Sequence, residues 1–520
     1  MSGDGNNSRQ SIIVDLLEEL FEFCQSDSLS EKGLREIIGL HGCNDNDPNI
    51  RFFRAACRNE QITEGIIRCL IEYFPNAVRH SGKRGQLPLH NICYNKNVTL
   101  GMVQLLINAF PESLRHEDND CLMPLHVLCI KKNLNEEVKL EILKLLLERC
   151  PESVKHTAEY DSLPIHFAAA FQSPQFCSRL IEAYSGSERI TNNNGQLPFH
   201  VACAWNTVAT TAKYLYQLYP ESIHVATNVG RYPIHLAIVG LKYRTDSPEA
   251  AIEMVLFLLD CEPNVVSQKF QLNLPLYWAC KEATNENTRK LNAYLKIVQI
   301  LYDKYPEAIE DNDVASDVGE FCAELQAFIN ARLTYARQAR DHNIMTTRCE
   351  NGQLPLHRAL CDNITLGSIK LLVKGNPSAI SCNDNIGMMP LHVACQHHES
   401  ASVVEYLINL DPTSLRAIDF EHNTSLHYAC RGANHAIIAL LTEKYGAVSV
   451  SKRNAHGQLP IDLLFASREV SDREGVEYTE SIYRLLKAYP ATVMNCTTET
   501  DEAKHSDSKM SGKKRKIDLV

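Results

Sequence analysis

The amino-acid sequence predicts an all-α solenoid, in which a short helical unit recurs along the chain and stacks on itself. The first observation is a recurring phrase: a hydrophobic residue, a proline, an aliphatic residue, usually a histidine, and then small residues. Its central positions are His90, His126, His166, His200, His235, Tyr277, His357, His392, His427 and Asp462. The second observation is their spacing, which is 36, 40, 34, 35, 42, 80, 35, 35 and 35 residues. A period in that range indicates stacked supersecondary units, none of which can bury its apolar face alone.

The third observation is the size of the chain. A chain of 520 residues is too long for one ordinary core, yet no linker divides it into globular domains. A solenoid resolves this conflict, because its core grows one layer at a time. The net charge of −11 is mild for this length, so we expect no direct nucleic-acid partner.

Residues 82–117 illustrate one predicted unit. Gly85 forms a turn, because glycine adopts positive φ without strain, and Pro88 suits the first position of a helix. Apolar residues at helical spacing then mark two helices, through Leu89, Ile92 and Cys93 and, after a break, through Val103, Leu106, Ile107 and Phe110. Pro111 ends the second helix, and an extended return leads to the next turn.

These phrases resemble ankyrin repeats, whose hallmark is Thr-Pro-Leu-His in a unit of about 33 residues. Three of the four letters match in Met123-Pro124-Leu125-His126, Leu354-Pro355-Leu356-His357 and Met389-Pro390-Leu391-His392. The likeness covers roughly residues 49–496. It implies an ankyrin-type stack of about 12 repeats with short hairpin turns between them.

The sequence departs from the ankyrin pattern at the threonine. Apolar or aromatic residues replace it in nine copies, namely Leu87, Met123, Leu163, Leu197, Tyr232, Leu274, Leu354, Met389 and Leu459, and only Thr424 remains. A helix N-cap hydroxyl contributes about 1 kcal/mol, so apolar burial between repeats must compensate. The hallmark is also missing from two stretches where worn, that is degenerate, copies of the repeat fit. The first lies around Phe53–Cys57, and the second lies around Val314–Val318 and is followed by a predicted long helix over 319–339.

We expect six segments along the chain. They are a disordered N-terminus at 1–10, capping helices at 11–48, an N-terminal repeat block at 49–310, a degenerate repeat with a long helix at 311–348, a C-terminal block and cap at 349–496, and a disordered basic tail at 497–520. The alternative interpretation of the N-terminal helices is a partner-binding element. The tail carries Lys513, Lys514, Arg515 and Lys516, a candidate nuclear import signal.

Histidine and cysteine recur three residues apart, which raises the question of metal binding. On a helix, each His-x-x-Cys pair such as His90 and Cys93 could offer two zinc ligands. The cysteine position is held elsewhere by Ala169, Ile238 or Leu360, which indicates packing rather than ligation. We therefore expect buried thiols, a hydrogen-bonding histidine, no cofactor, no metal and no catalytic residue; metal or thiol chemistry at these pairs stays as an alternative.

The chain has no apolar run of eighteen residues, and its beginning is polar, so we expect no membrane segment and no secretory signal. Nineteen cysteines then indicate a reducing compartment, cytoplasmic or nuclear. The expected function is a non-enzymatic, monomeric scaffold that binds one or more proteins on its concave face. A nuclear regulatory cofactor of the same fold is the alternative.

Residues that change from copy to copy are the candidate protein-binding residues. The resemblance to ankyrin repeats places them at hairpin tips and on the first helix of each repeat. The tip candidates are Lys83, Arg84, Asn119, Asp120, Asn193, Asn228, Asn385, Phe420 and Glu421. The helix candidates are Tyr94, Lys131, Phe171, Trp205, Lys281, Gln396, His397 and Arg431. Phe171 and Trp205 fall in adjacent repeats and are candidate hot spots, although Trp205 packed under a loop is the alternative.

Overall fold

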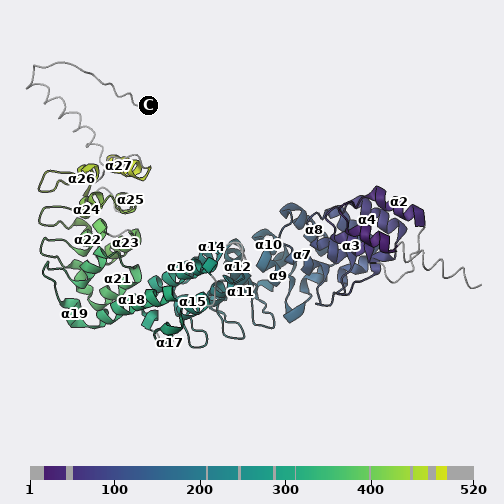
Figure 1. The fold of residues 1–520 in the computed structure, drawn as a ribbon, viewed down its shortest axis with the longest axis horizontal. Helices are drawn as coiled ribbons and strands as arrows, with labels where there is room; N and C mark the ends of the chain where they lie inside the picture. The colour runs from purple at the N-terminus through teal and green to yellow at the C-terminus, as the bar shows by residue number, and fades with distance from the viewer. Residues whose placement is uncertain are drawn as a thin grey trace, which may run out of the picture. The chain divides into compact units, whose positions relative to one another are not determined.

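The computed structural model describes residues 17–41, 51–205, 209–243, 248–284, 288–310, 312–397, 400–444, 449–466 and 476–488. Within these ranges every regular element is an α or 3-10 helix, and β structure is limited to two isolated bridges. The chain forms two compact units, Met1–Leu301 and Tyr302–Val520, and each is a stack of helix pairs (Figure 1). The predicted all-α repeat solenoid is confirmed.

Unit 1 contains two rows of helices, which we call inner and outer after their order in each repeat. The inner helices are α3 (Phe52–Arg58), α5 (Pro88–Tyr94), α7 (Pro124–Ile130), α9 (Pro164–Phe171), α11 (Pro198–Trp205), α13 (Pro233–Gly240) and α15 (Pro275–Thr284). The outer helices are α4 (Glu64–Tyr73), α6 (Leu100–Ala109), α8 (Glu136–Arg149), α10 (Pro174–Ala183), α12 (Thr210–Leu218), α14 (Glu249–Cys261) and α16 (Thr288–Lys304), the last three residues of α16 belonging to unit 2. Each inner helix packs against the next along the row.

Before the first repeat, residues 17–25 are helical and α2 (Glu31–His41) packs on α4. The worn copy expected at Phe53–Cys57 is the helix α3, in which Phe52, Phe53, Ala56 and Cys57 are buried. The predicted loose ends of the chain, with Lys513–Lys516, lie outside the described residues.

Unit 2 begins with elements that carry no hallmark and continues with regular repeats. The first elements are α17 (Asn312–Ser316), a 3-10 helix at Asp317–Glu320, α18 (Ala323–Arg340) and α19 (His342–Thr346). The inner helices are α20 (Pro355–Cys361), α22 (Pro390–His397), α24 (Ser425–Arg431) and α26 (Pro460–Ala466). The outer helices are α21 (Leu366–Gly375), α23 (Ala401–Leu410), α25 (His435–Glu443) and α27 (Val476–Ala488). Thus α18 is the long helix expected over 319–339, displaced toward the C-terminus.

In seven copies the hallmark histidine joins its repeat to the next one. In His392, Nδ1 accepts a hydrogen bond from the backbone N–H of Met389 at 3.1 Å, and Nε2 donates to the carbonyl of Ala417 at 3.2 Å. The same pair of bonds recurs at His90, His126, His166, His200, His357 and His427. Burial lowers the pKa of His90 to about 4, so this ring is neutral in the folded protein. The predicted hydrogen-bonding role of the histidine is confirmed.

The residue that replaces threonine is buried in eight of the nine copies and half-buried at Tyr232. Leu87, Leu163 and Leu354 are at most 3% exposed, so burial between repeats takes the place of the missing hydroxyl, as predicted. Thr424 is the copy that keeps the threonine, and its Oγ1 lies 2.8 Å from Nδ1 of His427. The cysteines of the repeat position are likewise fully buried.

The predicted extended return is wrong, because the residues after nine of the outer helices form a 3-10 helix. These segments are Ala77–Arg79, Pro111–Arg115, Pro151–Lys155, Ser187–Arg189, Pro220–His224, Pro263–Ser267, Pro306–Glu310, Pro377–Ser381 and Pro412–Arg416. The serine closes the turn: Ser113 Oγ donates to the carbonyl of Phe110 at 2.6 Å. Proline blocks an α-helical hydrogen bond but tolerates the first turn of a new helix, which explains the difference.

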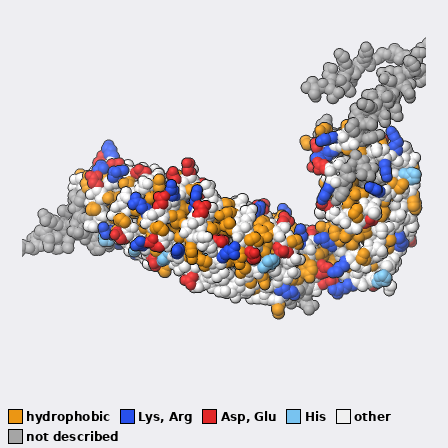
Figure 2. Space-filling model, turned by 180° about the vertical axis from the view of Figure 1, so that it is seen from behind, with side chains coloured by type: hydrophobic (Ala, Val, Ile, Leu, Met, Phe, Trp, Pro, Cys, Tyr) orange, Lys and Arg blue, Asp and Glu red, His pale blue; other side chains and the backbone are white. Residues whose placement is uncertain are grey.

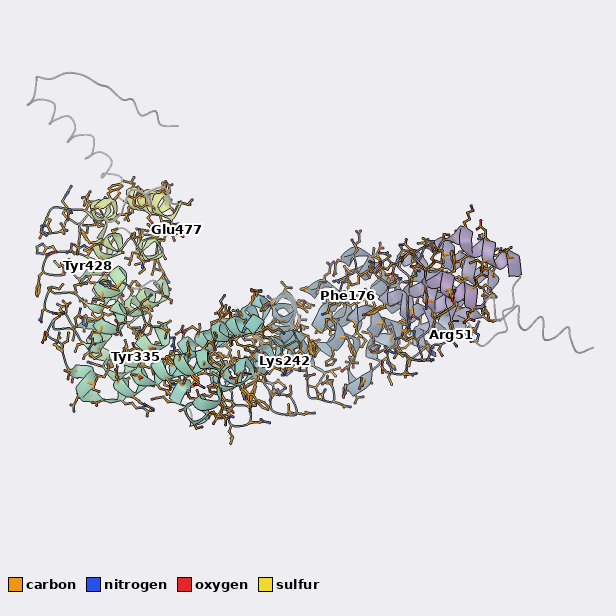
Figure 3. All side chains as sticks on the ribbon, viewed as in Figure 1. Arg51, Phe176, Lys242, Tyr335, Tyr428 and Glu477 are labelled. Carbon is orange, nitrogen blue, oxygen red and sulfur yellow. The ribbon has the colours of Figure 1, made fainter. Side chains whose placement is uncertain are left out.

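The hairpin tips are held by an acidic or amide side chain that the repeat pattern did not single out. Asp118 Oδ1 accepts the backbone N–H groups of Asp120 and Leu122, both at 3.0 Å. Asn192, Asp384, Asp419 and Asn454 do the same in other repeats. At the Asp419 tip, the Tyr428 hydroxyl also donates to Asp419 at 2.5 Å (Tyr428 is labelled in Figure 3). These five tips are therefore each closed by hydrogen bonds to one of their own side chains.

Candidate functional site

All nine predicted tip residues are exposed, but three of them also serve the scaffold. The side-chain amides of Asn119, Asn228 and Asn385 donate to a carbonyl of the preceding tip at 3.0, 2.8 and 2.9 Å respectively. These bonds hold neighbouring tips together. Comparison of repeats within one sequence did not reveal this role, because the amide is not present in every tip.

The helix candidates of unit 1 lie at or just after the C-terminal ends of inner helices, where aromatic rings and lysines occur close together. Tyr94 is 59% exposed, and the Lys131 ammonium lies 4.6 Å from its ring centre. Phe171 is half-buried and has Lys132 at 4.6 Å. Lys281 lies 5.3 Å from the Trp278 ring. These cation–π contacts position the lysines without neutralising them.

Trp205 is 40% exposed, so one part of its indole faces solvent. The rest stacks on Tyr243 of the following repeat, with ring centres 4.5 Å apart and ring planes 23° apart. Tyr243 is itself 51% exposed and was not predicted, since it lies beyond the hallmark helix. The two rings form one exposed aromatic surface.

In unit 2 the remaining candidates differ in how exposed their side chains are. His397 and Arg431 are exposed and Gln396 is half-buried. The Arg431 guanidinium lies 5.2 Å from the Tyr428 ring centre. The tip residue Phe420 is 71% exposed, and no other candidate in this unit presents as large an apolar side chain.

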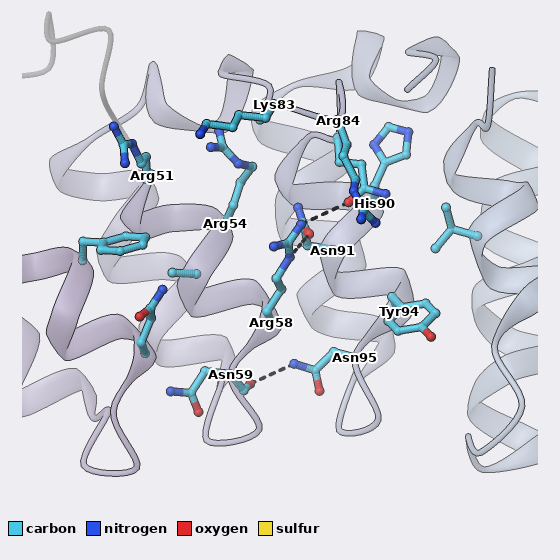
Figure 4. A pocket seen from close by; sticks show the side chains of 16 residues that line it. Arg51, Arg54, Arg58, Asn59, Lys83, Arg84, His90, Asn91, Tyr94 and Asn95 are labelled. Carbon is cyan, nitrogen blue, oxygen red and sulfur yellow. Dashed lines mark hydrogen bonds between the residues drawn. The ribbon is translucent and has the colours of Figure 1, made fainter. Parts of the chain in front are cut away.

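Unit 1 contains a groove of about 1070 Å³ between α3, α5 and the tip at Lys83 and Arg84 (Figure 4). Its lining includes three arginines that the repeat comparison missed, Arg51, Arg54 and Arg58, together with the predicted Lys83, Arg84 and Tyr94. The missed signal is their spacing of three and four residues, which puts them on one helix face. We call this cavity the basic groove, and none of the described residues that line it is acidic.

Hydrogen bonds to neutral groups position the arginines of the basic groove. Arg58 donates from Nε to Asn91 Oδ1 at 2.5 Å and from Nη2 to Gln86 Oε1 at 3.1 Å. Arg54 donates to the carbonyl of His80 at 3.1 Å. Burial lowers the pKa of Arg54, and repulsion from Arg58 and Arg51 adds to this effect.

The His-x-x-Cys pairs are poorly suited to metal binding. In the regular copies both ring nitrogens of the histidine are already hydrogen-bonded, as at His392. The thiol of Cys93 is fully buried, and burial raises its pKa to about 12, whereas a metal ligand must be a thiolate. Across the described ranges no three histidine, cysteine or acidic side chains form a group that could hold a metal ion.

No helix among the described residues is both long and apolar enough to cross a lipid bilayer. In comparisons with known proteins, residues 356–454 match the family model for ankyrin repeats, in three copies. No curated protein matches the chain. The matched residues include the inner helices α20, α22 and α24, whose histidine bonds recur in unit 1 at His90, His126, His166 and His200. Residues 356–454 are therefore ankyrin repeats, and the described residues as a whole form an all-α, ankyrin-like repeat solenoid.

Proposed function

We propose that this chain is a non-enzymatic scaffold that binds one or more proteins on the surface formed by its tips and the ends of its inner helices. Ankyrin repeats are a protein-binding architecture, and this supports protein partners. The observation that carries the proposal is the contrast within each repeat. The hallmark side chains are buried and bonded, whereas the varying side chains beside them, such as Tyr94 and Trp205, are exposed.

The rigidity of this surface favours binding. Tips are closed by side-chain hydrogen bonds, and neighbouring tips are joined by asparagine amides, so little conformational entropy is lost when a partner docks. The buried state of the recurring histidines and cysteines supports a role without catalysis, because a catalytic group must reach its substrate.

A second candidate function is a nuclear regulatory cofactor of the same fold. It depends on the cluster Lys513–Lys516, a pattern that import receptors recognise. Deleting residues 513–516 should abolish nuclear accumulation of a fluorescently tagged chain. Unchanged nuclear accumulation would remove this candidate and leave the scaffold proposal in place.

The scaffold proposal is tested by capturing partners with the parent chain and with the double variant Phe171→Ala/Trp205→Ala, followed by mass spectrometry. We expect proteins that bind the parent and are lost from the variant, because exposed aromatic anchors dominate interface energies. Tyr483→Ala on α27 is a matched control, since Tyr483 is an aromatic residue with 58% exposure in unit 2.

Circular dichroism must show that the parent, the double variant and the control are equally folded. Identical partners for the parent and the double variant would refute the placement of the binding surface at these two rings. A parent chain that captures no specific protein at all would refute the scaffold proposal itself.

A further inference from the structure

The five cations of the basic groove differ from several other cations of unit 1 in their ion pairing. Elsewhere in this unit, Arg35 pairs with Glu31 at 3.0 Å, and Lys96 pairs with Glu60 at 2.5 Å. Within the described residues, no carboxylate lies at ion-pair distance from a side chain of the basic groove. Among the described residues, positive charge is therefore concentrated there without a paired carboxylate, although the chain as a whole has a net charge of −11.

This arrangement raises the free energy of the unbound groove. Arg51, Arg54 and Arg58 repel one another, and Arg54 is half-buried, so water screens its charge incompletely. A bound anion would relieve the repulsion between these arginines, so the groove favours anionic ligands. By contrast, basic and acidic side chains are interspersed on the face of unit 1 shown in Figure 2.

The groove is also organised to receive its ligand. Gln86 and Asn91 hold the Arg58 guanidinium in place, and Gln86 is itself anchored by its amide to Asp118 at 3.2 Å. Figure 4 shows Arg54 and Arg58 along α3, with Lys83 and Arg84 on the neighbouring tip. A guanidinium held in this way loses little rotamer entropy when it forms a bidentate pair with a carboxylate.

The remaining lining favours a peptide over a nucleic acid. Sites for single strands stack successive bases on aromatic platforms. Apart from the buried His90, only Phe21 and Tyr94 supply aromatic rings here. A volume of about 1070 Å³ is at the upper end of ordinary ligand sites, which suits a short chain segment rather than a duplex. Tyr94 adds aromatic surface for an apolar side chain beside the acidic ones.

We propose that the basic groove, formed by Arg51, Arg54, Arg58, Lys83 and Arg84, binds a carboxylate-rich, extended segment of a partner protein. The proposal rests on the scaffold function and specifies the chemistry of one partner. The aromatic surface at Trp205 belongs to a later repeat of unit 1, so the two sites can be tested separately.

The test uses the full chain and a short fluorescein-labelled oligoglutamate peptide, with binding followed by fluorescence anisotropy. An oligoglutamine peptide of the same length is the neutral probe. We expect oligoglutamate to bind at least about tenfold more tightly than oligoglutamine, and its affinity to fall as sodium chloride is raised, because the exposed part of the attraction is screened. Equal affinity for the two probes would overturn the proposal.

Two variants test the location of the binding site. Arg54→Gln/Arg58→Gln should weaken oligoglutamate binding by about tenfold or more. Lys83→Gln/Arg84→Gln should weaken it as well, and these side chains donate no hydrogen bond among the described residues, so this variant leaves the scaffold intact. The matched control is Arg68→Gln/Arg149→Gln, which removes two exposed arginines from outer helices of unit 1. Equal loss in the control and in the groove variants would refute the location.

An oligonucleotide probe and a further variant distinguish the proposed peptide from two other occupants of the basic groove. A single-stranded oligonucleotide of equal charge that binds more tightly than oligoglutamate, and is lost in the Arg54/Arg58 variant, would overturn the proposal in favour of a nucleic acid. The chain's own segment before Arg51 carries Asp45 and Asp47. If Asp45→Asn/Asp47→Asn raises the oligoglutamate affinity about tenfold, that segment is the occupant and the proposal fails; an unchanged affinity supports it.

Failure of this proposal is distinguishable from failure of the scaffold function. If oligoglutamate does not bind while the Phe171/Trp205 variant loses captured proteins, only the proposal for the basic groove is overturned. If oligoglutamate binds and the groove variants lose it, the proposal is supported whatever the aromatic variant does.

Discussion

At the scale of the residue, the hallmark histidine forms a hydrogen bond with each of its two ring nitrogens. One ring nitrogen accepts from the start of its own helix and the other donates to a carbonyl of the next repeat, so only the neutral tautomer with hydrogen on Nε2 fits both bonds. The sequence predicts a buried hydrogen-bonding histidine, because the residue recurs in phase with apolar neighbours. It cannot predict that Ala417 is the acceptor for His392, since that pairing depends on how two repeats dock.

Replacing His392 by leucine should destabilise unit 2 by about 2–4 kcal/mol, because the buried Met389 N–H and the partly buried Ala417 carbonyl lose their partner. The measurement is urea unfolding followed by circular dichroism. The control is His397→Leu, at an exposed position of the same helix, which should change stability by less than about 0.5 kcal/mol. Equal effects of the two substitutions would contradict the bridging role.

At the scale of the element, neighbouring helices approach so closely that some positions admit only glycine. A Cβ on Gly240 of α13 would lie 2.3 Å from the Ala204 carbonyl oxygen of α11, and a Cβ on Gly432 would lie 2.4 Å from that of Gln396. A backbone atom cannot move aside as a flexible side chain can. The Trp205–Tyr243 stack lies at the end of the same α11–α13 pair, so this close packing also positions part of the candidate surface.

Gly240→Ala should therefore destabilise unit 1 by about 1–3 kcal/mol, although alanine is the better helix former. Gly39→Ala in α2 is the matched control, because a Cβ there has no atom within 4 Å. The control should be neutral or slightly stabilising. Thermal unfolding of the two variants and the parent checks both signs, and a Gly240 variant as stable as the parent would contradict the close contact.

At the scale of the whole molecule, the buried histidines act together through protonation. Burial lowers the pKa values of His90, His126, His166 and His200 to about 4, compared with about 6.5 for an exposed histidine. Between these values the unfolded chain binds protons that the folded chain does not. The stability contributed by neutral histidines is thus complete above pH 6.5 and is lost as the pH falls toward 4.

The thermal midpoint of the chain should fall steadily from pH 7 to pH 5. Each of these four histidines contributes a loss of about 1.4 kcal/mol per pH unit below 6.5, which amounts to about 2 kcal/mol per histidine at pH 5. Differential scanning calorimetry at constant ionic strength provides the measurement, and pH 8 against pH 7 is the internal control. A midpoint that stays constant down to pH 5 would show that the rings are not buried in neutral form.

The sequence by itself determined the repeat, the phase of its buried residues and the roles of its histidines and cysteines, because burial in a stack leaves the same residue types at the same position in every unit. Leu87 and Cys93 could be placed in this way. Only the tertiary structure brought Arg51, Arg54 and Arg58 beside Lys83 and Arg84, and stacked Tyr243 on Trp205. Those contacts join side chains of two different repeats at positions outside the hallmark, where no pattern recurs, so their geometry depends on how closely and at what angle the helices pack.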